Sequence, residues 1–146
     1  MIPKLILAKT KDFKEISKIY CAEFSKAPYN EDWTDLIAFK RIKQYSKYCD
    51  IWKLILNKEI IGFFVMNTSR WCPKEVCFGE EQAIKSEYQN KGYGKYMLTE
   101  LFKNYKTKGF KTYMGIVNVK GKALKLNNSL GVKNSRVNIL IEKKLN

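Results

Sequence analysis

Apolar residues recur along the chain at two spacings, which predict helices and strands in turn. After Asp12 they follow one helical face, and Glu15 stands where a capping residue belongs. Residues 51–56 and 59–66 have the pattern of strands joined by the hairpin signal Asn57-Lys58. The predicted elements are a strand over residues 4–8, helices over 12–24 and 32–47, strands over 51–56, 59–66 and 75–84, a helix between Gly94 and Gly109, a strand over 111–118, a helix over 121–130 and a last strand within 132–144. The order β-α-α-β-β-β-α-β-α-β predicts an α/β (α+β) fold, in which helices flank a mixed sheet.

The size of the chain fits one domain. Its 146 residues are enough for one hydrophobic core, so we expect a single domain over residues 1–146. No apolar run approaches the ~20 residues of a membrane-spanning helix. Near the N-terminus only residues 5–8 form an apolar run, which is too short for a secretory signal. We therefore expect a cytoplasmic protein that does not enter a membrane.

Positive charge is in excess and is spread along the whole chain, with a mild concentration from Lys103 to Lys125. The chain has 28 Lys and Arg against 14 Asp and Glu, a formal net charge of +14. Nearly all the basic residues are lysines, no block of five like charges occurs, and arginines interleaved with aromatic residues are sparse. The charge is consistent with a small anionic ligand such as a nucleotide and with a nucleic acid. Because only the charge favours a nucleic-acid partner, we do not expect one.

The absence of histidine excludes several kinds of site. Ser-His-Asp and Cys-His catalysis are impossible, and so is a zinc site that mixes cysteine and histidine. Cys21, Cys49, Cys72 and Cys77 lack the spacing of an all-cysteine metal site, so we expect free thiols, a reducing compartment and no metal. A general base must then be a carboxylate, a tyrosine, a lysine or a chain of waters.

The most informative segment precedes the third predicted helix and reads Gln89-Asn90-Lys91-Gly92-Tyr93-Gly94-Lys95. Glycines just before a helix let a ligand approach the backbone, and a helix N-terminus attracts an anion such as a pyrophosphate. The dinucleotide fingerprint G-x-G-x-x-G is not met, because Met97 stands at its third glycine. From the spacing alone, a phosphate site and a glycine-rich turn without a ligand both remain open.

This segment resembles the acetyl-CoA motif of the GNAT N-acetyltransferases, (Arg/Gln)-x-x-Gly-x-(Gly/Ala), through Gln89, Gly92 and Gly94. Residues 84–88 stand where the family has Val-x-Pro-x-Tyr, and residues 118–132 resemble its second cofactor segment. The predicted order of elements is similar to the GNAT fold from end to end. The resemblance implies an acetyl-CoA-dependent acyltransferase with a mostly antiparallel sheet, whose fourth and fifth strands splay apart.

The resemblance also implies which residues hold acetyl-CoA. Backbone amides would bind its pyrophosphate, and these belong to Gln89, Asn90, Lys91, Gly92, Tyr93, Gly94 and Lys95. Ala83 and Ile84 would pair with the pantetheine arm in the manner of a β-strand, and Asn118 would hydrogen-bond the same arm.

Two questions remain about the catalytic groups. The general-acid tyrosine of the family aligns with Asn127, which can donate a hydrogen bond to sulfur but cannot supply a proton. A thiol with a pKa of ~8.5 can leave without that proton, so slower or water-assisted release and an inactive binder are both open. The family's usual base is a carboxylate on the fourth strand, where Glu80 and Glu81 stand on opposite faces by strand alternation. Glu80 is the first candidate and Glu81 the second, and a bulge would exchange their faces.

Residues 28–33, Pro-Tyr-Asn-Glu-Asp-Trp, resemble a stretch of small-molecule GNATs that include aminoglycoside acetyltransferases. The resemblance implies that Tyr29, Glu31 and Trp33 contact the substrate. The leading hypothesis is acetyl transfer to a primary amine of a small molecule by direct attack in a ternary complex. An aminoglycoside, a protein or peptide amine, and a non-catalytic acyl-CoA-binding module are the alternatives, and the net charge of +14 disfavours a polycationic acceptor. Because many GNATs dimerise, a homodimer is also implied.

Overall fold

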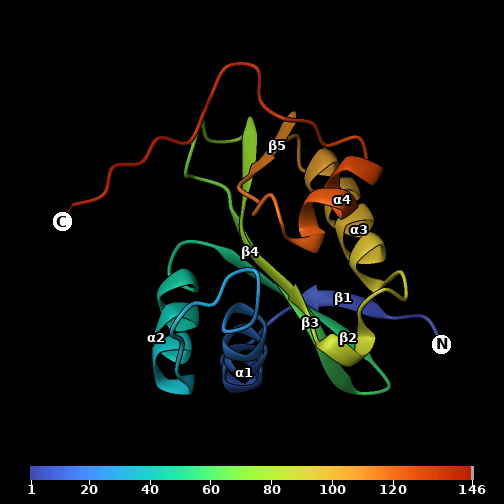
Figure 1. Cartoon of the computed structure of the whole chain (residues 1–146). Helices are drawn as coiled ribbons and strands as arrows, with labels where there is room; N and C mark the ends of the chain where they lie inside the picture. Colours follow the sequence, from blue (N-terminus) through green and yellow to red (C-terminus); the bar gives the residue numbers. More distant parts are fainter. Residues whose placement is uncertain (146) are drawn as a thin grey trace.

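A single five-stranded sheet, with the strands in the order β1-β2-β3-β4-β5, runs through the protein, and a computed structural model describes residues 1–145 (Figure 1). The strands are β1 (Lys4–Leu7), β2 (Asp50–Leu56), β3 (Glu59–Asn67), β4 (Val76–Ile84) and β5 (Thr112–Gly115). The helices are α1 (Phe13–Phe24), α2 (Asp35–Tyr45), α3 (Tyr93–Thr107) and α4 (Lys122–Ser129), with the 3₁₀ turns η1 (Thr10–Asp12) and η2 (Ser86–Tyr88). The mixed α/β fold predicted from the sequence is confirmed.

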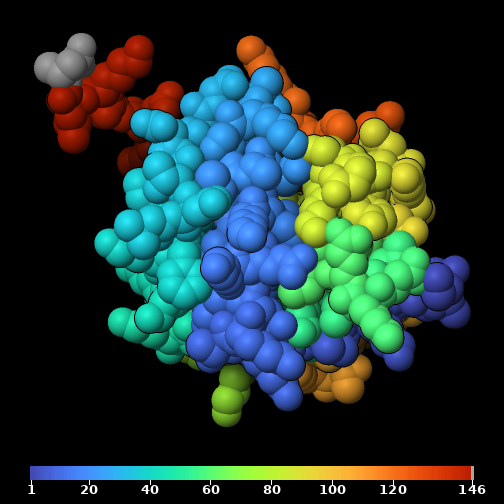
Figure 2. Space-filling view, turned by 90° about the horizontal axis from the view of Figure 1, so that it is seen from below, coloured from blue at the N-terminus to red at the C-terminus, as the bar shows by residue number. Residues whose placement is uncertain are grey.

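The helices cover both faces of the sheet, because neighbouring strand residues point to opposite sides. Phe63 of β3 packs in one core with Ile16 of α1 and Ile42 of α2, whereas the next residue, Phe64, packs in a second core with Leu98 of α3. The space-filling view from below shows α1 between α2 and the segment that follows β4 (Figure 2).

Strands β4 and β5 pair over only part of their length. Strands β1 to β4 are antiparallel, but β5 runs parallel to β4 and pairs with it from Val76↔Thr112 to Gly79↔Gly115. Residues 80–84 continue β4 without a β5 residue opposite them. The two strands therefore open apart after Gly79, as the resemblance implied.

A β-bulge lies in β4 beside this opening. Glu81 stands opposite Val65, and Gly79 stands opposite Met66, so Glu80 is the extra residue. Strict alternation, which predicts opposite faces for Glu80 and Glu81, therefore fails at this point.

The predicted last strand is wrong for the residues that the structure describes. Residues 132–145 form no strand, and Figure 1 shows them running over the top of the view and ending away from the sheet. Val137, Ile139 and Ile141 stand at every second position, which is the spacing that a strand would show, but all three are exposed. Within residues 1–145 the short β5 pairs with β4 alone, so this segment does not extend the sheet at the outer edge of β5.

Candidate active site

A small cleft of about 70 Å³ lies where β4 and β5 separate. Its walls come from the end of α1, the loop after it, β3, β4, β5 and the start of α4. The lining residues are Phe24, Tyr29, Phe64, Gly79, Glu80, Glu81, Gln82, Tyr113, Ile116, Val117, Asn118 and Ala123. Both glutamates that the sequence proposes as the base are thus brought to one cleft, together with Tyr29 and Asn118.

Glu81 is held beneath the helices α1 and α2. Its Oε1 atom accepts hydrogen bonds from the hydroxyls of Tyr20 and Tyr45, each at 3.0 Å. Burial raises the pKa of the Glu81 carboxyl, and the two tyrosines and the nearby Arg41 only partly offset this effect. A carboxylate whose pKa moves towards neutrality is suited to accept a proton.

Glu80 has different neighbours. Nη1 of Arg70 lies 2.9 and 3.0 Å from its two carboxylate oxygens, and Nδ2 of Asn67 donates to Oε1 at 3.0 Å. Burial and then the charge of Glu81 raise the pKa of Tyr45, and Glu80 adds to the same effect. Glu80 therefore lies near enough to Tyr45 for its charge to affect the same tyrosine that donates to Glu81.

The N-terminus of α3 is open. Its N-cap residue is Gly92, which has φ +86° and therefore a left-handed backbone, and no side chain caps the helix. The first amides of a helix have no acceptor within the helix, so those of Tyr93, Gly94 and Lys95 point to an uncapped end. A Cβ atom added at Gly92 would meet nothing within 4 Å. The structure thus provides space and backbone donors for an anion at this end.

Side-chain contacts fix the loop in front of α3. Nε2 of Gln89 donates to the carbonyl oxygen of Ile84 at 2.7 Å and to Oε2 of Glu23 at 2.8 Å. Oε1 of Glu23 accepts from both the backbone N–H and the hydroxyl of Ser86. Lys122 at the start of α4 donates to Oε1 of Gln89 at 2.9 Å. Gln89 therefore ties β4, α1 and α4 together. Glu23 was not foreseen, because nothing near it in the sequence indicates this long-range contact.

The other proposed residues have distinct positions. Asn127 is only 3% exposed, and its Nδ2 donates to the carbonyl oxygen of Ala123 within α4. Oδ1 of Asn118 accepts from the N–H of Lys120. Trp33 packs edge-on against Tyr20 with ring centroids 4.6 Å apart, so it belongs to the α1–α2 core. Glu31 lies near enough to Glu81 to raise its pKa.

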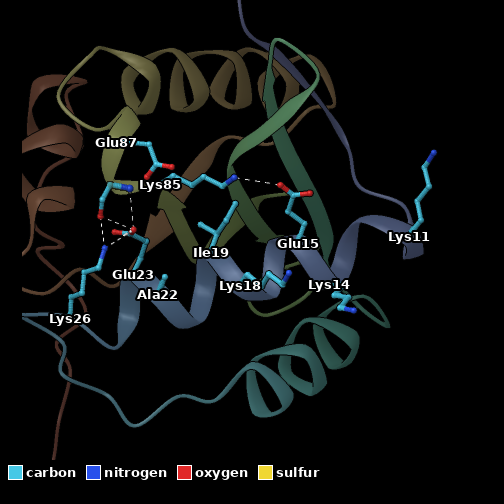
Figure 3. A pocket seen from close by; sticks show the side chains of 11 residues that line it. Lys11, Lys14, Glu15, Lys18, Ile19, Ala22, Glu23, Lys26, Lys85 and Glu87 are labelled. Carbon is cyan, nitrogen blue, oxygen red and sulfur yellow. Dashed lines mark hydrogen bonds and ion pairs between the residues drawn. The ribbon is translucent and has the colours of Figure 1, made fainter.

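A larger hollow of about 680 Å³ runs along α1, outside the cleft. Figure 3 shows it between α1 and the end of β4, crossed by the contacts of Lys85 with Glu15 and of Lys26 with Glu23. Its other lysines, Lys11, Lys14 and Lys18, are spaced along the helix surface rather than converging on one point (Figure 3). We assign no site to this hollow.

A comparison with family models decides the identity of the chain. The acetyltransferase (GNAT) family model matches residues 13–127. The chain belongs to the GNAT acetyltransferase family. Membership makes it an acyltransferase, and the match covers the opening between β4 and β5, the α3 N-terminus and most of α4. No curated protein matches the sequence.

Solved structures share this GNAT fold at low sequence identity. A possible acetyltransferase from Clostridium difficile 630 has a TM-score of 0.76 and 15% identity, with 100% of each chain covered. An N-acetyltransferase from Staphylococcus aureus Mu50 has a TM-score of 0.70 and 18% identity, covering 90% of this chain and 83% of that one. An aminoglycoside acetyltransferase from an uncultured soil metagenomic sample, in complex with sisomicin, has a TM-score of 0.64 and 15% identity, covering 99% and 95%.

The residues present fit the acetyl donor that the family uses. The uncapped α3 N-terminus offers donors for a pyrophosphate, and residues 80–84 offer a strand edge for an extended arm. Within residues 1–145, no group of three potential ligand side chains is placed to hold a metal ion. No helix in that range is long and apolar enough to cross a membrane.

Proposed function

We propose that this GNAT chain transfers the acetyl group of acetyl-CoA to a primary amine of a small molecule, by direct attack in a ternary complex. The observation that carries the proposal is the opening between β4 and β5, with an uncapped helix N-terminus at one end and the buried carboxylate of Glu81 beside it. These features supply an anion site, a channel and a base in one continuous region.

The donor lies along the opening in this proposal. The amides of residues 90–95 bind the pyrophosphate, with Lys91 and Lys95 adding positive charge. The Gln89 amide, which the resemblance also implied, already donates to the carbonyl oxygen of Ser86. The edge of β4 at Ala83 and Ile84 has no β5 residue opposite it and pairs with the pantetheine arm, although the Ile84 carbonyl oxygen also accepts from Gln89. Asn118 binds that arm from the β5 side. Backbone N–H groups next to the bulge polarise the acetyl carbonyl, which is the role of an oxyanion hole.

Glu81 acts as the base. An alkylamine with a pKa near ~10.4 is protonated at neutral pH, so it must lose a proton before it can attack. Glu81 takes that proton, directly or through water, and the amine nitrogen bonds to the acetyl carbon. The nitrogen then gives a second proton to water, and the carbon–sulfur bond breaks to release the CoA thiolate. Glu81 is favoured over Glu80 because Arg70 and Asn67 occupy the Glu80 oxygens. Glu31 and Tyr29 provide the polar wall that receives the amine.

An aminoglycoside is a second candidate acceptor. The sisomicin-bound relative shares the fold, and Glu31 and Glu81 place negative charge at one end of the cleft. The net charge of +14 acts against a polycation at long range. A small amine of low charge is therefore the first choice.

We also propose that the protein is located in the cytoplasm. Cys21, Cys49, Cys72 and Cys77 are free thiols, which suits the reducing cytoplasm.

Thiol release from acetyl-CoA in the presence of a panel of amines tests the function. The panel holds monoamines, polyamines, amino sugars, aminoglycosides and peptide amines. We expect amine-dependent release with at least one member, best among the small amines, and an acetylated product by mass spectrometry. Release that does not depend on an amine would be thioester hydrolysis and would contradict the proposed transfer to an amine. No release with any amine, although CoA binds, would favour a non-catalytic acyl-CoA-binding module.

A further inference from the structure

The hydroxyl of Tyr113 lies at the point where β4 and β5 separate. Tyr113 is in β5 and lines the cleft. A Cβ atom added to Gly79 would stand 2.5 Å from the Tyr113 hydroxyl oxygen, and one added to Gly115 would stand 3.2 Å from it. Gly79 and Gly115 form the last pair of the β4–β5 ladder. The two glycines thus leave the space that the phenol occupies.

The Tyr113 ring is fixed, but its hydroxyl is not engaged. The ring packs against Phe102 of α3 and Phe64 of β3, with centroids 4.9 and 6.4 Å apart. None of the hydrogen bonds within residues 1–145 involves the Tyr113 hydroxyl, whereas the hydroxyls of Tyr20, Tyr45 and Tyr105 all have partners. A hydroxyl that lines a cleft and has no partner among the described residues is an available donor.

We propose that the Tyr113 hydroxyl donates a hydrogen bond to the sulfur of CoA as the carbon–sulfur bond breaks. This inference rests on the proposed function, because it needs the thioester to reach the apex of the opening. Asn127 leaves the role unfilled, because it is only 3% exposed, does not line the cleft and uses one N–H of its side-chain amide to bind the carbonyl oxygen of Ala123.

Tyr113 acts as a hydrogen-bond donor and keeps its proton. Burial and then the neighbouring Cys77 raise the pKa of Tyr113 well above its usual value. The sulfur therefore leaves as a thiolate that takes the electron pair of the broken bond, and a proton from water reaches it after release. The neutral phenol stabilises the negative charge while it develops on sulfur.

The thiol pKa of bound CoA tests this inference without an acceptor. Thiolate absorbance is followed against pH for CoA bound to the wild type, to Tyr113→Phe and to Tyr29→Phe. Tyr29 is the matched control, because it also lines the cleft but its hydroxyl lies by Gly121, near the start of α4. We expect the bound thiol pKa to be about one to two units higher in Tyr113→Phe than in the wild type, and unchanged in Tyr29→Phe.

An equal thiol pKa in the wild type and in Tyr113→Phe would overturn the inference, and so would a rise confined to Tyr29→Phe. Failure of the wild type to bind CoA would overturn the proposed function as well, so the two failures are distinguishable. Phenylalanine keeps the ring contacts with Phe102 and Phe64, and an unchanged melting temperature verifies that Tyr113→Phe is folded.

Discussion

At the scale of single residues, Glu81 is the base that we propose for the reaction. Replacing it by glutamine keeps an acceptor for Tyr20 and Tyr45 but removes the base. We expect kcat of Glu81→Gln to fall by about 10²- to 10⁴-fold, with little change in CoA affinity. Burial raises the pKa of Glu81 above 4.5, and only the deprotonated carboxylate can act as a base. The activity of the wild type should therefore fall as the pH is lowered through that raised pKa. Steady-state kinetics against pH measures both effects.

Glu80→Gln is the matched control, and it should retain a rate within a few-fold of the wild type. A deep loss of rate in Glu80→Gln with a mild loss in Glu81→Gln would assign the base to Glu80.

The same carboxyl predicts an effect on stability. Because the pKa of Glu81 is higher in the folded protein than in the unfolded chain, Glu81 lowers the stability as the pH rises through the folded pKa. Glu81→Gln should therefore melt at or above the wild-type temperature at neutral pH.

A buried ion pair joins the start of α1 to β2. Nζ of Lys53 lies 2.7 Å from Oδ2 of Asp12, and both side chains are about nine-tenths buried. Asp12→Asn leaves Lys53 buried without its counter-charge, so we expect a loss of about 3–5 kcal/mol of unfolding free energy. Urea unfolding measures it, and adding Lys53→Met should recover much of the loss. An Asp12→Asn variant as stable as the wild type would contradict this account.

The same pair predicts sensitivity to acid. Burial alone would raise the pKa of Asp12, but hydrogen bonds from Lys53 and from the N–H of Lys9 lower it below 3.8. The stabilisation is therefore complete above that unfolded value and is lost as the pH falls through the lower folded pKa. Asp12→Asn should remove this acid-dependent part of the unfolding curve.

At the scale of elements, the α3 N-terminus can be tested with a pair of glycines. Gly92 has φ +86° and Gly109 has φ +94°, and a Cβ at either would meet nothing within 4 Å. Valine at either position is strained by a similar amount, about 1–2 kcal/mol. Only Gly92→Val moves the amides at the start of α3, so we expect at least a tenfold loss of CoA affinity there and none in Gly109→Val. Calorimetric titration distinguishes them, and equal affinities would contradict the phosphate site.

Local signals explain which elements the sequence could predict. The hairpin at Asn57 and Lys58 depends only on nearby residues, and so does the start of α3 after Gly92. The spacing of residues in the sequence was therefore enough to predict both features. The faces of Glu80 and Glu81 depend on the register with β3, and no residue in β4 indicates the bulge. The partners of Glu81 on α1 and α2, and the Glu23–Gln89 contact, are brought together only by the folded sheet.

At the scale of the whole molecule, the exposed aliphatic residues after α4 predict that two copies of the chain associate. Val137, Ile139 and Ile141 are 83–89% exposed, and the outer edge of β5 has no strand partner within residues 1–145. If this segment pairs with the β5 edge of a second copy, the pairing covers the aliphatic side chains of one copy and the unpaired strand edge of the other. We expect concentration-dependent association in sedimentation velocity, and loss of it when these three residues are changed to serine.

Leu36 and Ile37 on α2 are the control for this association, because they are also exposed and apolar. Serine at both positions should leave association unchanged. A wild type that sediments as a monomer at every concentration would contradict the pairing.

The most direct test of the account is a backbone-amide NMR titration of the intact chain with CoA. The account predicts saturable shifts at residues 90–95 and at Gly79 and Gly115, with the lysine-lined hollow of α1 unaffected. Shifts confined to Lys11, Lys14 and Lys18 of that hollow, or no saturable shift at all, would contradict it.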